Sequence, residues 1–237
     1  MLKNNKKLIE GKTLLLLDFD GVVVPGPNRK ELDEFINRSA SIISEHKKIP
    51  IDAAQTLLNE QMIKNNYVTV SQLFFMEYPE IDAEYVKERI FGEYNRYKYR
   101  QNDRYNLYVS YALDKIKHNG LDIAILTNNS EDVVNRVLPS LKLDSIIKTV
   151  IGSERLNPLL KPETKAYKKA LKILDHEASK TLFLDDSITN VIGAMIAGIT
   201  SVYIGDSDDK DAAIRYKTLH SFLRRQYPIN NILWIIG

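Results

Sequence analysis

The chain has 237 residues, of which 44% are hydrophobic and 27% charged, a composition that fits a soluble globular protein and excludes a disordered one. Its formal net charge is +2, from 33 basic and 31 acidic residues, so charge gives no reason to expect a nucleic-acid polymer as a partner. Cysteine is absent, which excludes disulfides and thiol chemistry and leaves oxygen and imidazole as the possible metal ligands.

The amino-terminal stretch resembles a signal peptide only in its lysines. The apolar run that starts at Leu14 is interrupted at Asp18, and no cleavage-type pattern of small residues follows. No segment approaches the roughly 20 apolar residues that span a bilayer. We therefore expect a cytoplasmic protein with no membrane partner.

The first predicted element is a buried strand at residues 13–19. Four leucines run directly into Asp18, and Asp20 and Gly21 follow closely. An unpaired acid at the end of a buried strand costs stability, so a purely structural explanation is weaker for Asp18 than for any other candidate residue. A functional role for the two acids is therefore favoured.

Residues 28–104 show no pattern of a buried strand, and a turn at Pro25, Gly26 and Pro27 precedes them. Apolar residues recur there at helical spacing, as at Leu32, Phe35, Ile36 and Ile43. Asp52 and Asp82 are expected to cap two further helices. We therefore predict an α-helical insertion at 28–104 within a core domain formed by 1–27 and 105–237.

After the insertion, strands alternate with helices. Further strands are expected at 121–127, 146–151, 181–184 and 201–204, and helices at 131–138, 163–174 and 188–197. This alternation predicts an α/β fold with a Rossmann-like parallel sheet that is covered on both faces. The apolar tail at 231–237 is expected to form a last edge strand or to plug the core.

Polar residues stand where three of the predicted strands end, namely Asp18, Thr127 and Asp185. Because the carboxyl ends of parallel strands meet at one edge of a sheet, we expect these residues to share a site. The neighbouring candidates are Asp20, Asn128, Lys161, Asp186 and Asn190. Each of them alone has an ordinary explanation as a helix cap, a packing residue or a solvated side chain, but their joint placement favours a site.

Clustered aspartates without histidine or cysteine favour a hard divalent cation, and Mg2+ is the usual one at phosphate sites. The carboxylates of Asp18 and of Asp185 or Asp186 and the carbonyl of Asp20 are the candidate ligands. A carboxylate can also attack phosphorus, which gives an aspartyl-phosphate that water hydrolyses. The four histidines, His46, His118, His176 and His220, show no metal-type spacing and are expected at the surface.

Four motifs resemble those of the haloacid dehalogenase (HAD) superfamily of aspartyl-phosphate phosphatases. They are "LLLLDFDGVVV", "ILTNN", Lys161, and "LFLDDSITNVIGAMIAGI". The resemblance implies that Asp18 is the nucleophile and Asp20 the general acid and base. It also implies that Thr127, Asn128 and Lys161 bind the phosphoryl group of the substrate.

For the metal, the resemblance implies Mg2+ held by Asp18, Asp20 and Asp186, with Asp185 assisting and Asn190 in a supporting role. The helical insertion is similar to the caps that cover the site in this superfamily. Such caps exclude water and select the leaving group.

The insertion phrase "IPIDAAQTLLNEQMIKNNYVTVSQLF" is similar to pyrimidine 5'-nucleotidase-like members of the superfamily. The predicted substrate is therefore a small phosphomonoester, with a pyrimidine nucleoside monophosphate as the first candidate. A sugar phosphate or phosphoglycolate is the alternative. The tyrosine-rich run at 93–111 either stacks on a base or packs the cap onto the core.

Three other functional classes fit the sequence less well. A dehalogenase of the same superfamily normally lacks the second acid, here Asp20. A non-catalytic phosphoacceptor signalling module carries its acidic pair first in the chain, whereas Asp185 and Asp186 come last. A catalytically inactive binding protein would be expected to have lost a motif residue, and none is missing. An enzyme is favoured, and its oligomeric state is left open.

Overall fold

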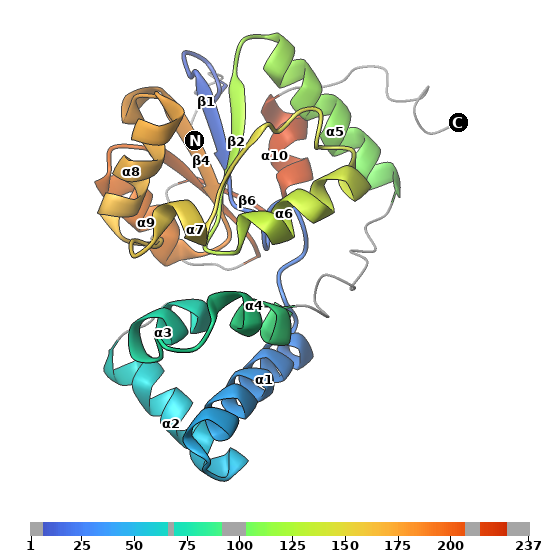
Figure 1. Ribbon diagram of the computed structural model, residues 1–237. Helices are drawn as coiled ribbons and strands as arrows, with labels where there is room; N and C mark the ends of the chain where they lie inside the picture. The colour runs from blue at the N-terminus through green and yellow to red at the C-terminus, as the bar shows by residue number, and fades with distance from the viewer. Residues whose placement is uncertain (1–6, 66–68, 92–102, 207–213, 227–237) are drawn as a thin grey trace. The chain divides into compact units, whose positions relative to one another are not determined.

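The computed structural model describes residues 7–65, 69–91, 103–206 and 214–226. The chain divides into two compact units, Met1–Gly26 with Tyr99–Gly237, and Pro27–Lys98. The first is called the core unit and the second the helical unit, and each is described by itself (Figure 1). The division into a core domain and a cap with separate roles stays a prediction.

The core unit contains a parallel sheet whose strands lie in the order β3-β2-β1-β4-β5-β6 (Figure 1). Their bounds are β1 Leu14–Leu17, β2 Asp122–Leu126, β3 Thr149–Ile151, β4 Thr181–Asp185, β5 Thr200–Ile204 and β6 Arg215–Tyr216. All pairings are parallel. The predicted Rossmann-like α/β core is confirmed.

The central strand β1 is hydrogen-bonded on both sides. Leu17 aligns with Ile125 of β2 and with Leu184 of β4, so the three strands end at nearly the same level. All four leucines of β1 have no exposed surface. The residues that directly follow β1 and β2, and the last residue of β4, therefore lie at one edge of the sheet.

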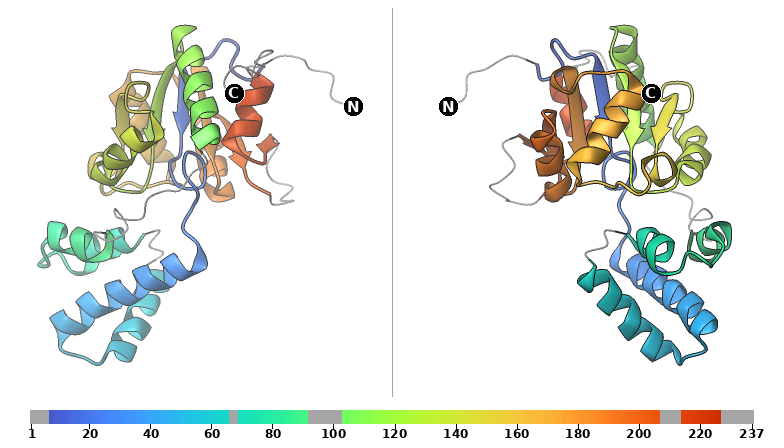
Figure 2. Two further views of the ribbon diagram at one scale, coloured as in Figure 1. Left: turned by 90° about the vertical axis from the view of Figure 1, so that its right-hand side faces the viewer. Right: turned by 60° about the vertical axis from the view of Figure 1, so that its left-hand side comes forward.

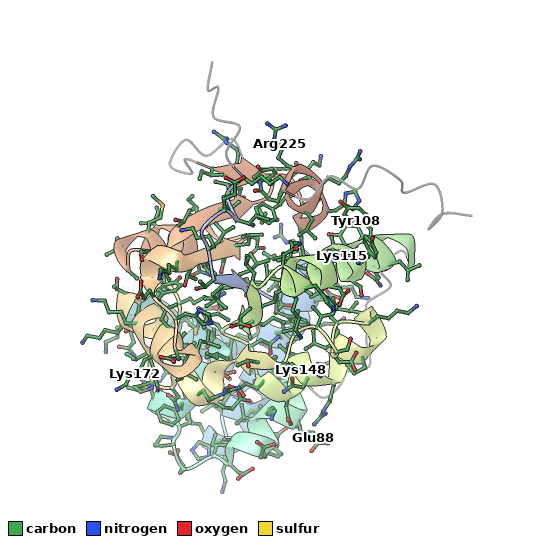
Figure 3. All side chains as sticks on the ribbon, turned by 90° about the horizontal axis from the view of Figure 1, so that it is seen from above. Glu88, Tyr108, Lys115, Lys148, Lys172 and Arg225 are labelled. Atoms are coloured by element: carbon green, nitrogen blue, oxygen red, sulfur yellow. The ribbon has the colours of Figure 1, made fainter. Side chains whose placement is uncertain are left out.

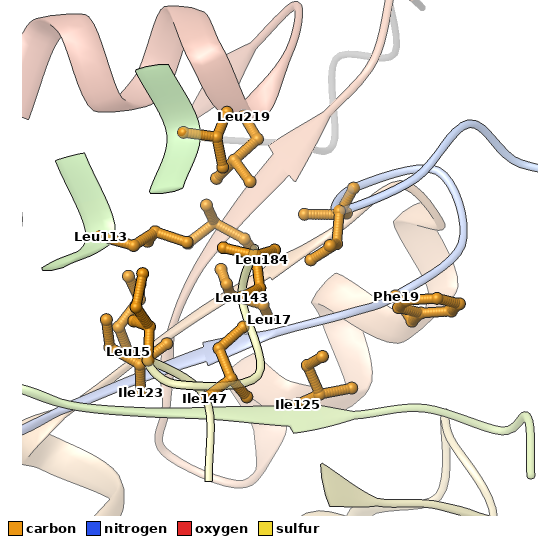
Figure 4. Packing of buried hydrophobic residues seen from close by; sticks show 14 of the residues in the cluster. Leu15, Leu17, Phe19, Leu113, Ile123, Ile125, Leu143, Ile147, Leu184 and Leu219 are labelled. Carbon is orange, nitrogen blue, oxygen red and sulfur yellow. The ribbon is translucent and has the colours of Figure 1, made fainter. Parts of the chain in front are cut away.

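The side chains of β1 alternate between two hydrophobic cores, as the period of a strand requires. Leu15 and Leu17 pack with residues of α5 (Asp103–His118), α6 (Glu131–Val137) and α10 (Leu219–Gln226), as Figure 4 shows for Leu113 and Leu219. Leu14 and Leu16 pack with the opposite layer, which consists of α7 (Ser153–Leu156), α8 (Thr164–Leu174) and α9 (Ile188–Ile196). The two helical layers are visible on either side of the sheet in Figure 2.

Several elements differ from the expectation. The strand predicted at 146–151 is confined to β3, because Ile146 and Ile147 are buried in the turn that precedes it. The sequence patterns did not predict β6, α7 or α10. The predicted helical insertion extends to residue 104, but α5 begins at Asp103 and packs against β2 and α10 in the core unit. The apolar tail at 231–237 lies outside the described residues.

The helical unit contains α1 (Arg29–Lys47), α2 (Ile51–Lys64), α3 (Val70–Glu77) and α4 (Ala83–Phe91), so its predicted helical character is confirmed. It has its own core, which includes Ile43, Leu58, Leu73, Tyr78 and Ile90. None of the described helices in either unit combines the length and apolar character of a membrane span.

One of the two predicted helix caps is correct. Asp82 Oδ1 accepts a hydrogen bond of 2.8 Å from the Tyr85 N–H and caps α4. The prediction for Asp52 is wrong, because α2 begins at Ile51 with Pro50 at the N-cap position. Pro50 occupies the position from which a side chain would cap α2, and Asp52 is the second residue of the helix.

Candidate active site

The edge at which β1, β2 and β4 end brings together Asp18, Thr127 and Asp185. The Asp18 N–H donates to Leu184 O at 2.8 Å, and the Thr127 N–H donates to Ile151 O at 3.0 Å. These bonds continue the strand ladders by one residue, so the sheet itself positions the side chains. All three residues are buried.

Lys161 lies between two of these carboxylates. Its Nζ is 2.8 Å from Asp18 Oδ1 and 2.7 Å from Asp185 Oδ2, and only 1% of its side chain is exposed. By contrast, Lys148 and Lys172 are exposed, and Lys172 extends outward at the edge of the core unit (Figure 3). Lys161 is therefore part of a buried ion-pair cluster.

Asn128 holds the loop that carries Lys161. Its Oδ1 accepts from the Lys161 N–H and its Nδ2 donates to Lys161 O, both at 2.9 Å. The side chain of Asn128 thus acts on the lysine loop, and its predicted contact with a phosphoryl group stays a prediction. Thr127 Oγ1 accepts from the Asn129 N–H at 3.0 Å.

Asp185 is the most heavily bonded carboxylate of the cluster. Its Oδ1 accepts from the Ser187 N–H at 2.8 Å and from Asn190 Nδ2 at 3.0 Å, while Oδ2 accepts from Lys161 and again from Asn190, at 3.2 Å. Asn190 is itself held, because its backbone O accepts from the Tyr167 hydroxyl at 2.7 Å. Asp185 therefore orients the side chains of Lys161 and Asn190.

Asp186 lies against Gly21 at the end of the first motif. A Cβ placed on Gly21 would lie 1.8 Å from Asp186 Oδ2, and the φ of Gly21 is +80°. Only glycine accommodates both the close approach and this backbone conformation. The carboxylate of Asp186 is thereby partly withdrawn from water although the residue as a whole is exposed.

The carboxylate oxygens of Asp18, Asp185 and Asp186 lie within 4.8 Å of one another. Burial raises the pKa of Asp186 to about 6, with the charge of Asp185 adding to the effect. Burial also raises the pKa of Asp18 well above its ordinary value, again with Asp185 contributing and Lys161 opposing. The cluster therefore binds protons more readily than isolated carboxylates do, because three buried or partly buried acids share one lysine.

The protonation of Lys161 follows from the same cluster. Burial alone would lower the pKa of Lys161, but the charges and hydrogen bonds of Asp18 and Asp185 outweigh it and raise the pKa. Lys161 is therefore held as a cation. A cation with donors in fixed positions can bind a phosphoryl oxygen as well as a carboxylate.

Asp20 sits in a tight turn, in which the N–H groups of Val23 and Val24 both donate to Phe19 O. The carboxylate of Asp20 does not belong to the cluster of three, but its charge raises the pKa of both Asp18 and Asp186. Its Oδ2 accepts a hydrogen bond of 3.1 Å from Asn129 Nδ2. The sequence patterns did not single out Asn129, although it is the last residue of the motif "ILTNN".

Comparison with known proteins gives a family and several relatives. Residues 15–204 match the model of a family described as haloacid dehalogenase-like hydrolase. A phosphoglycolate phosphatase of Pseudomonas fluorescens is 29% identical over 128 residues, which make up 52% of this chain and 44% of that protein. Phosphoglycolate phosphatase 1 of Pseudomonas aeruginosa is 33% identical over 88 residues, which make up 37% of this chain and 32% of that protein. The chain thus spans less than half the length of these two relatives.

Among solved structures, a HAD phosphatase from Thermococcus onnurineus superposes with a TM-score of 0.61 at 20% identity. The superposition covers 90% of this chain and 96% of that one. At this level of identity the likeness concerns the fold.

Proposed function

Because this chain belongs to the haloacid dehalogenase-like hydrolase family, we propose that it is a Mg2+-dependent phosphatase that forms an aspartyl-phosphate on Asp18. The observation that carries the proposal is the buried cluster in which Lys161 bridges Asp18 and Asp185, with Asp186 beside them. A carboxylate nucleophile, a fixed cation and a set of oxygen ligands are what phosphoryl transfer to an aspartate requires.

The residues fit Mg2+. The cluster offers only oxygen ligands, and it carries three carboxylates against one lysine. Asp18, Asp186 and the carbonyl of Asp20 would hold the ion, with Asp185 assisting through the hydrogen bonds described above. The ion would neutralise the negative charge shared by the carboxylates and an incoming phosphate.

The orientation of Asp18 supports its role as the nucleophile. Among the described residues, the Phe19 N–H (2.7 Å) and Lys161 Nζ (2.8 Å) both contact Oδ1. The other oxygen, Oδ2, is therefore the one that would bond to phosphorus.

The reaction proceeds in two balanced steps. First, Asp18 Oδ2 bonds to phosphorus, the ester P–O bond breaks, and the leaving oxygen takes a proton from the Asp20 carboxyl group. Second, the Asp20 carboxylate takes a proton from water as the water oxygen bonds to phosphorus, and the Asp18–phosphorus bond breaks. Inorganic phosphate leaves, and both aspartates return to their starting forms. Lys161 and Thr127 hold the phosphoryl oxygens in both steps.

We propose phosphoglycolate, a small phosphorylated carboxylate, as the first substrate candidate. Two relatives are named for that activity. The nucleotide alternative has less support, because two tyrosines of the tyrosine-rich run already pack on His220 in the core unit. The ring of Tyr105 stacks on it at 5.7 Å between centroids, and the tilted ring of Tyr108 lies at 4.4 Å. Residues 93–102 of that run lie outside the described residues. We assign substrate selection to the helical unit.

Steady-state kinetics with 2-phosphoglycolate, a hexose phosphate and uridine monophosphate would test the proposal. Activity should disappear with EDTA and return with Mg2+, and kcat/KM for 2-phosphoglycolate should exceed that for the nucleotide by 10-fold or more, about 1.4 kcal/mol in transition-state binding. Asp18→Asn should abolish turnover and the acid-stable phosphoenzyme, whereas Asp144→Asn at an exposed position should change neither. Full turnover in metal-free protein, or activity in Asp18→Asn, would overturn the mechanism. A nucleotide preference would overturn only the substrate.

A further inference from the structure

The hydrogen bond between Asn129 and Asp20 connects two loops that are far apart in the chain. Asn129 Nδ2 lies 3.1 Å from Asp20 Oδ2 across a separation of 109 residues. Asp20 belongs to the turn after β1, and Asn129 to the loop after the neighbouring strand β2. The bond therefore depends on the register of these two strands.

The amide of Asn129 can face Asp20 in only one orientation. Its Oδ1 accepts a hydrogen bond of 2.7 Å from the Ser130 N–H. A rotated amide would place its NH2 group against that N–H and its oxygen against the carboxylate of Asp20, and both contacts would be repulsive. The donor of Asn129 is therefore directed at Asp20.

The backbone of Asn129 is fixed as well. Its N–H donates to Thr127 Oγ1 at 3.0 Å, and its O accepts from the Ser153 N–H at 3.0 Å. A Cβ on Gly152 would lie 2.7 Å from Asn129 O, so glycine is needed for the loop after β3 to approach this closely. The position of Asn129 thus depends on its own loop and on the loop after β3.

Charged side chains also join the loop after β2 to the segment that follows β3. Glu131 Oε1 accepts from the Gly152 N–H at 3.0 Å and from Arg155 Nε at 2.7 Å. In the other direction, Glu154 accepts from the Ser130 hydroxyl at 2.5 Å and from the Glu131 N–H at 2.9 Å. These bonds hold Ser130 and Glu131, the two residues that directly follow Asn129.

We propose that Asn129 is a positioning residue that holds the carboxylate of Asp20 in place for proton transfer, an inference that rests on the proposed phosphatase function. A proton donor must keep its geometry to within a fraction of an ångström, and side chains that are themselves fixed provide this. Asn129 is neutral, so it orients Asp20 without adding charge.

The test compares two phosphate esters that differ in their need for an acid. An alkyl phosphate such as 2-phosphoglycolate has a poor leaving group, whereas p-nitrophenyl phosphate has a good one. General acid catalysis contributes about 100-fold or more, so Asn129→Ala should lower kcat for the alkyl ester by at least about 10-fold. Its kcat for the aryl ester should change by less than about 3-fold. The inhibition constant of inorganic phosphate should stay the same, because phosphate binding needs no proton transfer.

Two further variants separate positioning from a loss of structure. Asn129→Asp keeps the shape of the side chain but places a negative charge against Asp20, so it should lower alkyl turnover more than Asn129→Ala does. In an Asp20→Asn background, Asn129→Ala should cause no additional loss, because the group that it positions is already gone.

The matched control is Asn65→Asp in the helical unit. Asn65 Nδ2 also donates to a carboxylate oxygen, Glu77 Oε1, at 2.8 Å, and this pair is exposed. The control should leave the ratio of alkyl to aryl turnover unchanged.

Three results would overturn the positioning role while the phosphatase proposal stands. They are an equal loss on both esters, an additive loss in the Asp20→Asn background, and unchanged alkyl turnover in Asn129→Ala. If the unmodified protein hydrolyses neither ester, the phosphatase proposal fails and the positioning role fails with it.

Discussion

At the scale of single residues, Gly21 links the first and last motifs of the site. It has no side chain, and the Asp186 carboxylate occupies the space where a Cβ would be. The contact means that the metal-ligand geometry proposed for Asp186 depends on a residue 165 positions earlier in the chain. A substitution at Gly21 should therefore disturb the position of Asp186 at the metal site more than the position of the nucleophile Asp18.

Gly21→Ala should displace Asp186 and raise the Mg2+ concentration needed for half-maximal activity by about 10-fold or more, the range seen when groups that orient metal ligands are lost. A positive φ in a residue other than glycine adds roughly 1 kcal/mol of strain. Activity titrated against Mg2+ and a thermal unfolding midpoint measure the two effects.

Gly11→Ala is the control for Gly21→Ala. Its φ is +74°, but nothing lies within 4 Å of the added Cβ, so it carries the strain without the clash. If Gly11→Ala and Gly21→Ala shift the Mg2+ requirement equally, contact with Asp186 is not the cause.

At the scale of elements, α10 packs on α5 through an aromatic cluster around His220. Its ring contacts Tyr105 and Tyr108, and Arg224 lies on the same helix. Burial lowers the pKa of His220 from its ordinary value near 6.5, and the charge of Arg224 lowers it further. His220 is half-buried, so the expectation that all four histidines lie at the surface holds for it only in part. The same is true of His176, whose side chain is 13% exposed and bonds to Asp122.

The lowered pKa of His220 makes the core unit less stable in acid. The unfolded chain binds a proton at His220 at a higher pH than the folded chain does. The neutral His220 ring therefore makes its full contribution to the free energy of unfolding above about pH 6.5, and this contribution is lost as the pH falls through the pKa of the folded state. His220→Phe keeps an aromatic ring and removes this titration. The decrease in the unfolding midpoint between pH 7.5 and pH 5 should therefore be smaller in His220→Phe than in the unmodified protein.

His118→Phe provides the comparison for that series. The side chain of His118 is 70% exposed, so this variant should keep the pH dependence of the parent. An unchanged acid sensitivity in His220→Phe would contradict the assignment to His220.

At the scale of the whole molecule, the two units have separate hydrophobic cores. Leu58 belongs to the core of the helical unit, and Leu182 belongs to one of the two cores that flank the sheet. Both side chains are almost fully buried. Chains with separate cores commonly depart from two-state unfolding.

Scanning calorimetry should therefore resolve two transitions. Leu58→Ala and Leu182→Ala each remove a buried side chain at a cost of about 2–5 kcal/mol, and each should lower the midpoint of a different transition. One transition that both variants lower by the same amount would show that the two units unfold together.

The sequence by itself determined the type and order of most elements in the core unit. Runs of leucine, isoleucine and valine that end at polar residues predict buried parallel strands, because only apolar side chains fit on both covered faces of such a sheet. Since parallel strands end at a common edge, Asp18, Thr127 and Asp185 could be assigned to one site before any pairing was known. The strand β6 has only two residues, which are too few to form a pattern. By contrast, Leu219, Phe222 and Leu223 of α10 recur at helical spacing, so that helix could have been predicted.

Only the tertiary structure decided how these residues contact one another. Lys161 has the sequence context of a solvated surface lysine, yet the fold buries it between two carboxylates. Asn128 holds the backbone of the lysine loop, and Asn129 contacts Asp20 from the next strand. These contacts join residues between 24 and 143 positions apart, and they depend on strand register and loop packing. Local sequence patterns report which backbone conformation a segment prefers, but they carry no information on which distant side chain completes a hydrogen bond.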